Sequence, residues 1–294
     1  MTISRETVVG AYRLILGREP ESEDVILQYM KLGSVEQLRE EFLQSEEFLA
    51  KAAGRLFDAP QFKSRYKQAL TGTLQGSALN DPDYPYVGIE EVPGTDDFFE
   101  LFNTVFAPRL MGTKNREPGF RRMFEALRDL GLQRPLILES GCLRVPGNWA
   151  GDGQSTFLLD AYARLEGADF FSVDNNPESV DSARRACSDR TQLILNDSVA
   201  AFITIASICQ GRRVDLLYLD SFDLDPDDPA PSAAHHAREF EAIRSLVKSG
   251  TIICVDDFRV GDMVGGKGAL IEARMREMNA RVLHDGYQKV WQVR

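Results

Sequence analysis

The sequence predicts an α/β protein in which a mostly parallel sheet, closed by an antiparallel hairpin, follows a small all-helical domain. Three observations support this prediction. Five short apolar runs alternate with helical stretches after residue 135, and two strand-like runs end the chain. The first 67 residues instead repeat apolar side chains at three- and four-residue steps, which is typical of amphipathic helices.

Residues 1–67 are predicted to form the helical module. Its apolar faces are expected to come from Val8, Tyr12, Ile15, Leu16, Val25, Tyr29, Leu32, Leu38, Phe42 and Leu43. Gly33 is expected to end one helix, and Ser34 with Gln37 matches a capping box that starts the next.

Residues 12–49 resemble the short helical repeat domain of the DUF4214 type. The resemblance rests on Tyr12, Arg13, Gly17, Arg18, Pro20, Ser45, Glu47 and Phe48. In that family the module lies beside glycan-active and exported-protein domains. We expect it to serve docking, oligomerisation or substrate delivery in this protein. A generic helical bundle with a helix-turn-helix pattern explains the same periodicity.

A polar linker is predicted over residues 68–96. It carries the helix- and strand-breaking residues Gly72, Gly76, Pro82, Pro85, Gly88, Pro93 and Gly94. Two amphipathic helices, over residues 96–108 and 118–132, are then expected to open the main domain, which spans residues 97–294.

The main domain is predicted to contain five parallel strands and a terminal hairpin. The strands are expected at residues 135–140, 169–174, 191–197, 214–220 and 251–257, and the hairpin at residues 280–286 and 287–293. The continuous apolar character of the five runs favours strands that are buried on both faces.

Each expected parallel strand ends in an acidic residue. These residues are Glu139, Asp174, Asp197, Asp220, Asp256 and Asp257. Ligands of open parallel sheets bind beyond the carboxyl ends of the strands, and a fold that needs only a core has no use for carboxylates there. The pattern therefore predicts a ligand site at this edge of the sheet.

Residues 97–294 resemble the class I S-adenosylmethionine-dependent methyltransferases, whose Rossmann-like sheet carries a closing antiparallel hairpin. The resemblance rests on the segment LILESGC (136–142) and on the acidic strand ends, and it is closest to small-molecule and sugar O-methyltransferases. It implies a cofactor site made by Glu139, Gly141, Ser155, Thr156, Asp174, Asn175, Asp197 and Ser198. Asp174 would accept hydrogen bonds from the ribose hydroxyls, and Asp197 with Ser198 would reach the adenine edge.

The loop after the first strand departs from the compact glycine pattern of that family. Its glycines, Gly141, Gly147, Gly151 and Gly153, are spread over thirteen positions. The spacing also differs from the dinucleotide pattern G-x-G-x-x-G, which disfavours a nicotinamide cofactor. Trp149 in this loop fits either the acceptor side of the site or the core.

Asp220 and Asp257, with Asp256 as an alternate, are candidate ligands of a divalent metal. If their strands are neighbours, ~4.8 Å apart, two carboxylates there repel by about 3 kcal/mol at an effective dielectric of 20. Mg²⁺, Mn²⁺ or Ca²⁺ would relieve this repulsion, and metal-dependent O-methyltransferases that the chain resembles place a cation at these strand ends. Alternatively, the carboxylates bind cofactor or helix N-termini, or one of them is protonated.

His235 and His236 open the helix after the fourth strand and are candidates for the general base that deprotonates the acceptor, together with Asp220. With Glu239 they could instead hold iron, or they could be solvated residues of a helix start. Lys267, in the glycine-rich segment after the fifth strand, fits either neutralisation of an anionic substrate or exposure to solvent.

The bulk composition bears on partners and compartment. A net charge of −11 repels nucleic acid and anionic membrane surfaces. The N-terminus lacks the pattern of a secretory signal, and no run approaches the ~18 apolar residues of a membrane span. The four cysteines form no CxxC pair, so we expect reduced thiols in a cytoplasmic protein.

Together these features predict a methyltransferase that moves the methyl group of S-adenosylmethionine to a hydroxyl oxygen of a sugar, glycan or other small molecule. Two alternatives come from other classes: an iron-dependent oxygenase on the same fold, and a non-catalytic protein that keeps the cofactor site. An NAD-linked oxidoreductase is the weakest alternative.

Overall fold

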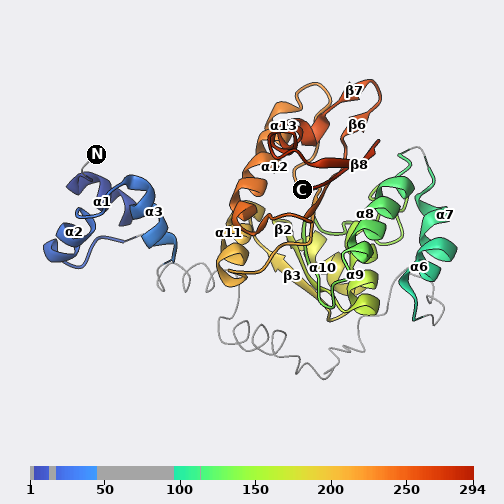
Figure 1. The fold of residues 1–294 in the computed structure, drawn as a ribbon, viewed down its shortest axis with the longest axis horizontal. Coiled ribbons are helices and arrows are strands. Elements are labelled where there is room, and N and C mark those ends of the chain that lie inside the picture. Colours follow the sequence, from blue (N-terminus) through green and yellow to red (C-terminus); the bar gives the residue numbers. More distant parts are fainter. Residues whose placement is uncertain (1–2, 13–17, 45–95, 113) are drawn as a thin grey trace. The chain divides into compact units, whose positions relative to one another are not determined.

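The computed structural model describes residues 3–12, 18–44, 96–112 and 114–294 (Figure 1). The chain divides into two compact units, residues 1–75 and 76–294, and each is considered by itself. Apart from Asp96, the predicted linker over residues 68–96 lies outside the described residues, as do its glycines and prolines.

The first unit contains three described helices, α1 (Arg5–Ala11), α2 (Glu23–Tyr29) and α3 (Val35–Gln44). The predicted capping box at the start of α3 is half formed. Ser34 Oγ accepts the Gln37 N–H at 3.2 Å, but Gln37 Oε1 accepts the Gly33 N–H at 2.8 Å instead of bonding to Ser34.

A small aromatic core holds these helices together. Its buried members are Ile3, Val8, Tyr12, Ile26, Leu38 and Phe42. The rings of Tyr12 and Phe42 meet edge to face at 4.8 Å, the geometry that aromatic pairs prefer. Ile15, Leu16 and the motif residues Arg13, Gly17, Ser45, Glu47 and Phe48 lie outside the described residues, and so does the side chain of Leu43.

The second unit is built on a seven-stranded sheet with the order β3-β2-β1-β4-β5-β9-β8. Its strands are β1 (Leu136–Ser140), β2 (Asp169–Asp174), β3 (Thr191–Leu195), β4 (Leu216–Leu219), β5 (Ile252–Val255), β8 (Arg281–Asp285) and β9 (Lys289–Gln292). The first five are parallel, and β9 runs antiparallel between β5 and β8. The predicted strands and closing hairpin are confirmed, so this is a Rossmann-like α/β unit.

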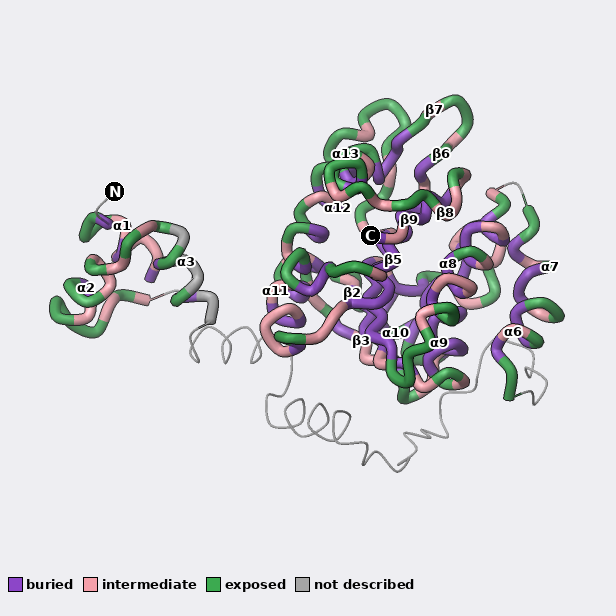
Figure 2. The backbone as a smooth tube through the Cα atoms, viewed as in Figure 1, coloured by how far each residue is buried: buried purple, intermediate pink, exposed green. Residues whose placement is uncertain are grey.

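Two helical layers cover the sheet (Figure 1). One contains α6 (Phe98–Leu101), a π-helical turn (Phe102–Phe106), α7 (Ala107–Leu110), α8 (Glu117–Asp129), α9 (Ser155–Glu166) and α10 (Pro177–Ala186). The other contains α11 (Ser198–Ile208), α12 (Ala230–Ile243) and α13 (Ala269–Glu277). The central strands β1, β4 and β5 are buried along their whole length (Figure 2), which explains why they read as unbroken apolar runs. The edge strand β8 is largely exposed.

The segment after β5 adds structure that the periodicity does not predict. A short hairpin, β6 (Arg259–Val260) with β7 (Met263–Val264), precedes a 3-10 turn over Gly266–Gly268. Gly265 and Gly266 adopt positive φ angles of 107° and 40°, and a Cβ on Gly266 would collide with the carbonyl oxygen of Asp257. The glycines therefore let the chain fold back onto the end of β5.

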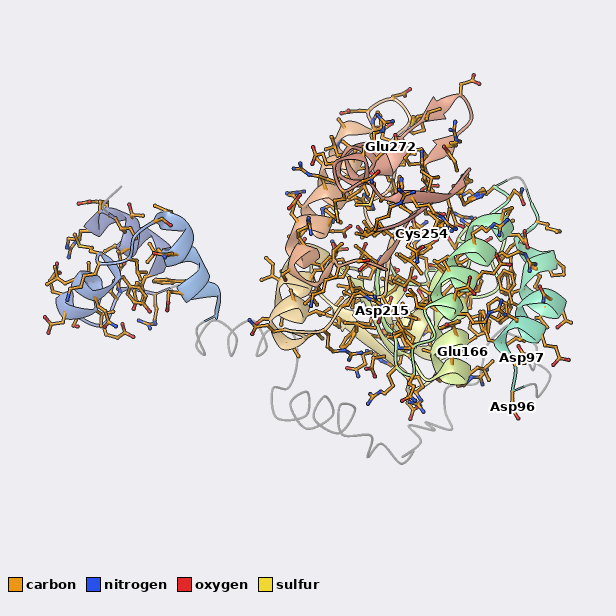
Figure 3. All side chains as sticks on the ribbon, viewed as in Figure 1. Asp96, Asp97, Glu166, Asp215, Cys254 and Glu272 are labelled. Atoms are coloured by element: carbon orange, nitrogen blue, oxygen red, sulfur yellow. The ribbon has the colours of Figure 1, made fainter. Side chains whose placement is uncertain are left out.

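The described part of the chain holds no helix with the length and apolar character that a bilayer span requires. All four cysteines are thiols in the structure, and burial raises the pKa of Cys142, Cys187 and Cys254 well above the ordinary value. Cys254 lies in the middle of the sheet (Figure 3).

Candidate active site

The turn that follows β1 begins at Gly141, which packs directly against the end of β4. Its φ is 89°, and a Cβ at this position would lie 2.7 Å from the carbonyl oxygen of Asp220. Only glycine accommodates both the conformation and the contact. The turn therefore brings backbone close to the carboxyl ends of both β1 and β4.

Glu139 and Thr156 lie behind this turn and are fully buried. The Ser172 hydroxyl donates to Glu139 Oε2, and desolvation raises the pKa of Glu139 to about 7. Thr156 Oγ1 accepts the Leu143 N–H at 2.8 Å. These two side chains fix the loop that starts at Gly141, whereas neighbouring Ser155 lines the adjacent cavity.

Asp174 ends β2 and bonds to two backbone amides. Its Oδ2 accepts the Cys142 N–H and its Oδ1 accepts the Asn176 N–H, both at 2.8 Å. An ionised carboxylate has about four acceptor positions, so two remain on Asp174. The carboxylate is thus held in place and can still accept hydrogen bonds from a ligand.

A cavity of about 270 Å³ opens at the carboxyl ends of β1 to β4. We call it the cofactor cavity, after the ligand that the sequence resemblance implies for these residues. Of the site residues predicted from sequence, it is lined by Gly141, Ser155, Asp174, Asn175, Asp197, Ser198, Asp220 and His235. Residues far apart in the chain therefore converge where an open parallel sheet binds its ligand.

The cofactor cavity is acidic. Asp152, Asp174, Asp197, Asp220 and Asp223 all line it. Arg144, the one Lys or Arg among its described lining residues, pairs with Asp223 at 3.0 Å and with Asp152 at 3.4 Å. Negative charge exceeds positive charge in this cavity, so it favours a cationic ligand.

Three carboxylates meet where β4 and β5 end. Asp220, Asp256 and Asp257 each place an oxygen within 4.8 Å of the others, as the predicted strand neighbours require. Lys267 Nζ lies 2.7 Å from Asp220 Oδ1 and 3.0 Å from Asp257 Oδ2. Arg116 clamps Asp256 through Nη2 at 2.7 Å and Nε at 3.0 Å. We call this set the carboxylate cluster.

Burial sets the protonation of the carboxylate cluster. Desolvation raises the pKa of Asp220 to about 8, opposed by Lys267 and assisted by repulsion from Asp256 and Asp257. Desolvation alone would lower the pKa of Lys267, but attraction to Asp220 and Asp257 outweighs it and raises that pKa above the ordinary value. The two carboxylates therefore favour the charged form of Lys267.

This arrangement does not fit a divalent metal bound by Asp220, Asp256 and Asp257. Such ions need carboxylate oxygens at about 2.0 to 2.6 Å, whereas Lys267 bonds one oxygen each of Asp220 and Asp257 and Arg116 bonds both oxygens of Asp256. The positive charge that the sequence led us to expect is present, but it belongs to the chain. Neither cation was identified as the partner of these carboxylates from sequence.

A second cavity, of about 580 Å³, lies on the other side of the carboxylate cluster. We call it the acceptor cavity, after the methyl acceptor that the sequence resemblance implies. It is lined by Lys114, Leu224, Pro226, Asp257, Arg259, Val260, Gly261 and Tyr287. The Tyr287 hydroxyl bonds to Asp257 Oδ1. Asp220 thus faces the cofactor cavity, Asp257 faces the acceptor cavity, and Lys267 joins the two carboxylates.

The two histidines occupy different environments. His235 lines the cofactor cavity, where its Nε2 lies 3.0 Å from Ser198 Oγ and 3.2 Å from Glu239 Oε1. His236 is fully buried inside α12, and its Nδ1 lies 2.8 Å from the Ser232 carbonyl oxygen. Desolvation lowers the pKa of His236 to about 4. This geometry does not support His236 as the general base, because its ring has no access to an acceptor.

The two histidines are not part of a group of side chains that could share a metal ion in the described structure. Among the described residues, the carboxylate cluster is the group of three or more His, Cys, Asp or Glu side chains close enough to share an ion. Trp149 stacks on Phe106 at 5.9 Å and packs against the core of the unit, in agreement with the core alternative.

No protein-family model and no curated protein matches the chain. Similar folds are found among solved structures. The MycE methyltransferase of mycinamycin biosynthesis, in complex with Mg, SAH and mycinamycin VI, is 15% identical over 67% of this chain and 53% of its own, with a TM-score of 0.45. The chain therefore spans about half the length of MycE.

Two further structures show the same range of similarity. Apo CalS11, a TDP-rhamnose 3'-O-methyltransferase of calicheamicin biosynthesis, is 15% identical over 80% of this chain and 94% of its own, with a TM-score of 0.39. An rRNA methylase from Streptococcus thermophilus is 11% identical over 60% and 96%, with a TM-score of 0.40. The strand order and the site geometry of this chain, not these similarities, carry the functional argument.

Proposed function

We propose that this protein binds S-adenosylmethionine in the cofactor cavity and transfers its methyl group to a hydroxyl oxygen of a small molecule. The observation that carries the proposal is the acidic lining of a cavity at the carboxyl ends of β1 to β4. S-adenosylmethionine brings a sulfonium and an ammonium against one carboxylate. A nicotinamide dinucleotide would bring a pyrophosphate, which the lining carboxylates would repel.

Different residues of the cofactor cavity would bind different parts of the cofactor. Asp174 keeps two acceptor positions for the ribose hydroxyls, with Asn175 beside it. Ser198 and Asp197 stand at the adenine end, and His235, hydrogen-bonded to Ser198, completes that end. This role for His235 replaces the general-base role expected from sequence.

The acceptor cavity lies where a methyl donor in the cofactor cavity would be attacked. A hydroxyl oxygen forms a bond to the methyl carbon, the carbon–sulfur bond breaks with its electron pair going to sulfur, and the hydroxyl proton leaves. The chain contributes mainly alignment of the two reactants. Asp220 is our candidate for the proton acceptor, because it lines the cofactor cavity and Lys267 joins it to Asp257 of the acceptor cavity. Its raised pKa, about 8, favours proton uptake.

A sugar or glycan hydroxyl is the acceptor that we favour. The acceptor cavity combines an aromatic ring, Tyr287, with apolar Leu224, Pro226 and Val260, a surface on which a sugar ring can pack. The resemblance of residues 12–49 to a module found beside glycan-active domains favours the same class. That module would serve docking, oligomerisation or substrate delivery.

No metal takes part in this proposal, because Lys267 and Arg116 neutralise the carboxylates that would bind one. The iron-dependent oxygenase is disfavoured for a related reason. His236 bonds to a helix carbonyl, and His235 bonds to Ser198 and Glu239. Within the described part of the chain, the two histidines and Glu239 do not form a group whose ligand atoms are close enough to share an ion.

Methyl transfer from labelled S-adenosylmethionine tests the proposal. A panel of free sugars, nucleotide sugars and phenolic glycosides is incubated with the full chain, and methylated product and S-adenosylhomocysteine are both measured. We expect stoichiometric formation of both with at least one sugar hydroxyl, and at least 100-fold slower turnover in Asp220→Asn with cofactor affinity retained. Tight cofactor binding without transfer would identify a non-catalytic binding protein, and absence of cofactor binding would contradict the proposal altogether.

A further inference from the structure

The carboxylate cluster has the three acidic side chains of a metal site, but in this structure its positive charge comes from side chains of the protein. Three acidic side chains with oxygens within 4.8 Å of one another would ordinarily repel strongly. All three are buried or half-buried, so solvent screens the repulsion only weakly. The cluster therefore depends on a cation at its centre.

Lys267 occupies that centre. Its Nζ lies 2.7 Å from Asp220 Oδ1, 3.0 Å from Asp257 Oδ2 and 3.4 Å from the Asp220 carbonyl oxygen. An ammonium has three N–H donors, and three oxygens surround this one. Lys267 is 2% exposed, so water does not compete for these bonds.

The backbone holds Lys267 in this position. The positive φ angles of Gly265 and Gly266 turn the chain back, and the Lys267 N–H lies 3.4 Å from the Asp257 carbonyl oxygen. A Cβ on Gly268 would lie 2.7 Å from the Phe258 ring. The glycines on both sides of Lys267 thus serve close packing against the end of β5.

We infer that the Lys267 ammonium takes the place of a divalent cation in the carboxylate cluster. Lys267 is a positioning residue: it ties Asp220 of the cofactor cavity to Asp257 of the acceptor cavity, while Arg116 neutralises Asp256. A divalent ion could enter only by displacing the ammonium, because two cations of the chain already face three carboxylates. The inference does not rest on the proposed function, since it concerns the protein alone.

Titration of Mn²⁺ into the full chain, without cofactor or acceptor, tests this inference by calorimetry and by the paramagnetic resonance signal of free Mn²⁺. We expect the carboxylate cluster of the wild type to bind no Mn²⁺. Lys267→Met removes the ammonium, keeps a similar chain length and leaves three carboxylates, so one Mn²⁺ should bind with a Kd on the order of 10⁻⁴ M or tighter. Adding Asp257→Asn to that variant should abolish the gain.

Lys289 offers a matched control. It is buried to a similar degree, and its Nζ joins Glu272 (labelled in Figure 3) at 2.7 Å and Asp285 at 3.0 Å. Each of these two carboxylates also has an arginine partner, Arg276 and Arg259 respectively. Lys289→Met should therefore gain no Mn²⁺ site, which separates removal of a buried lysine from exposure of the carboxylate cluster.

Two results would overturn the inference. One is Mn²⁺ binding by the wild type that Asp220→Asn or Asp257→Asn abolishes, because the ion would then enter with Lys267 in place. The other is a folded Lys267→Met variant that gains no binding. Should that variant fail to fold by circular dichroism, the wild type decides: no binding, or binding that both Asp→Asn variants retain, supports the inference.

Discussion

The cofactor cavity and the acceptor cavity lie at the same edge of the sheet, but they differ in whether their aspartates have buried cationic partners. Of the five aspartates that line the cofactor cavity, Asp220 is bonded by Lys267, and Asp152 and Asp223 share the half-exposed Arg144. Asp174 and Asp197 have no cation among the described lining residues. On the acceptor side, Asp256 and Asp257 are bonded by Arg116 and Lys267, both almost fully buried. Uncompensated charge remains where a cationic cofactor would bind, and compensated charge stands where a neutral acceptor would meet it.

The difference teaches that carboxylates at strand ends have two separate uses in this protein. Charge without a partner attracts a ligand of opposite sign, at some cost to stability. Charge with a buried partner fixes geometry, and its removal leaves an uncompensated ion in a medium of low dielectric. Substitutions can therefore distinguish the two sides by whether they affect ligand binding or folding.

Arg116→Ala should have the largest effect and tests the compensated side. It leaves Asp256, which has no exposed surface, without its cation. We expect the free energy of unfolding to fall by about 3 to 5 kcal/mol, measured by urea denaturation. Arg134→Ala is the control, because Asp169 is half-buried and keeps a second partner, Arg212, at 2.7 Å. Its effect should stay within about 1 kcal/mol, and equal losses in the two variants would contradict the distinction.

Gly141→Ala tests the backbone approach at the cofactor cavity. The added Cβ would lie 2.7 Å from the Asp220 carbonyl oxygen, at a φ of 89°. We expect about 2 to 3 kcal/mol of destabilisation, from a left-handed conformation and from a contact with rigid backbone.

Gly211 shows what the conformation alone contributes. Its φ is also 89°, but a Cβ there would meet nothing within 4 Å. Gly211→Ala should therefore cost only about 1 kcal/mol. Thermal or urea unfolding of both variants measures the difference, and equal effects would show that the contact with Asp220 is unimportant.

The buried side chain of His236 is expected to make the stability of the protein depend on pH, because no carboxylate of the described residues lies within hydrogen-bonding distance of its ring. Desolvation lowers its pKa to about 4, and Glu239, 3.9 Å away, only partly offsets this. Between the ordinary pKa of 6.5 and about 4, the unfolded chain binds a proton that the folded chain does not, so stability falls as pH falls.

The measurement compares urea unfolding of the wild type and His236→Gln at pH 7 and pH 5. Between these values the wild type should lose on the order of 2 kcal/mol more than the variant. Glu139, whose raised pKa acts in the opposite direction, is common to both proteins and cancels. Identical pH dependence would mean that folding leaves the pKa of His236 unchanged.

The sequence predicts those features of the structure that depend on residues close together in the chain better than those that depend on residues far apart. Apolar runs predict the strands of the main sheet, and strand burial leaves this local pattern most clearly in β1, β4 and β5. Asp174, Asp197 and Asp220 are predicted to share an edge, because parallel strands end together. The partners are not predictable in this way: Arg116 is 140 residues from Asp256, and Lys267 is 47 residues from Asp220. No short-range pattern connects such pairs, so neither Arg116 nor Lys267 was predicted as a partner of these carboxylates.

The sequence also does not predict which individual side chains face the cofactor cavity and which are buried. His235 and His236 are adjacent, yet one lines the cofactor cavity and the other is enclosed in α12. Adjacent helical residues point about 100° apart, so which of them faces the cavity depends on how α12 packs. Ser155 and Thr156 differ for the same reason.

The central claim, that the cofactor cavity binds S-adenosylmethionine through Asp174, is tested most directly by calorimetric titration of the cofactor into the wild type and Asp174→Asn. Asp189→Ala, an exposed residue of the turn before β3, serves as the control. We predict micromolar binding to the wild type and the control, unchanged by Mg²⁺ or chelator, and at least tenfold weaker binding to Asp174→Asn, about 1.4 kcal/mol. No binding, or binding that Asp174→Asn leaves unchanged, would contradict the claim.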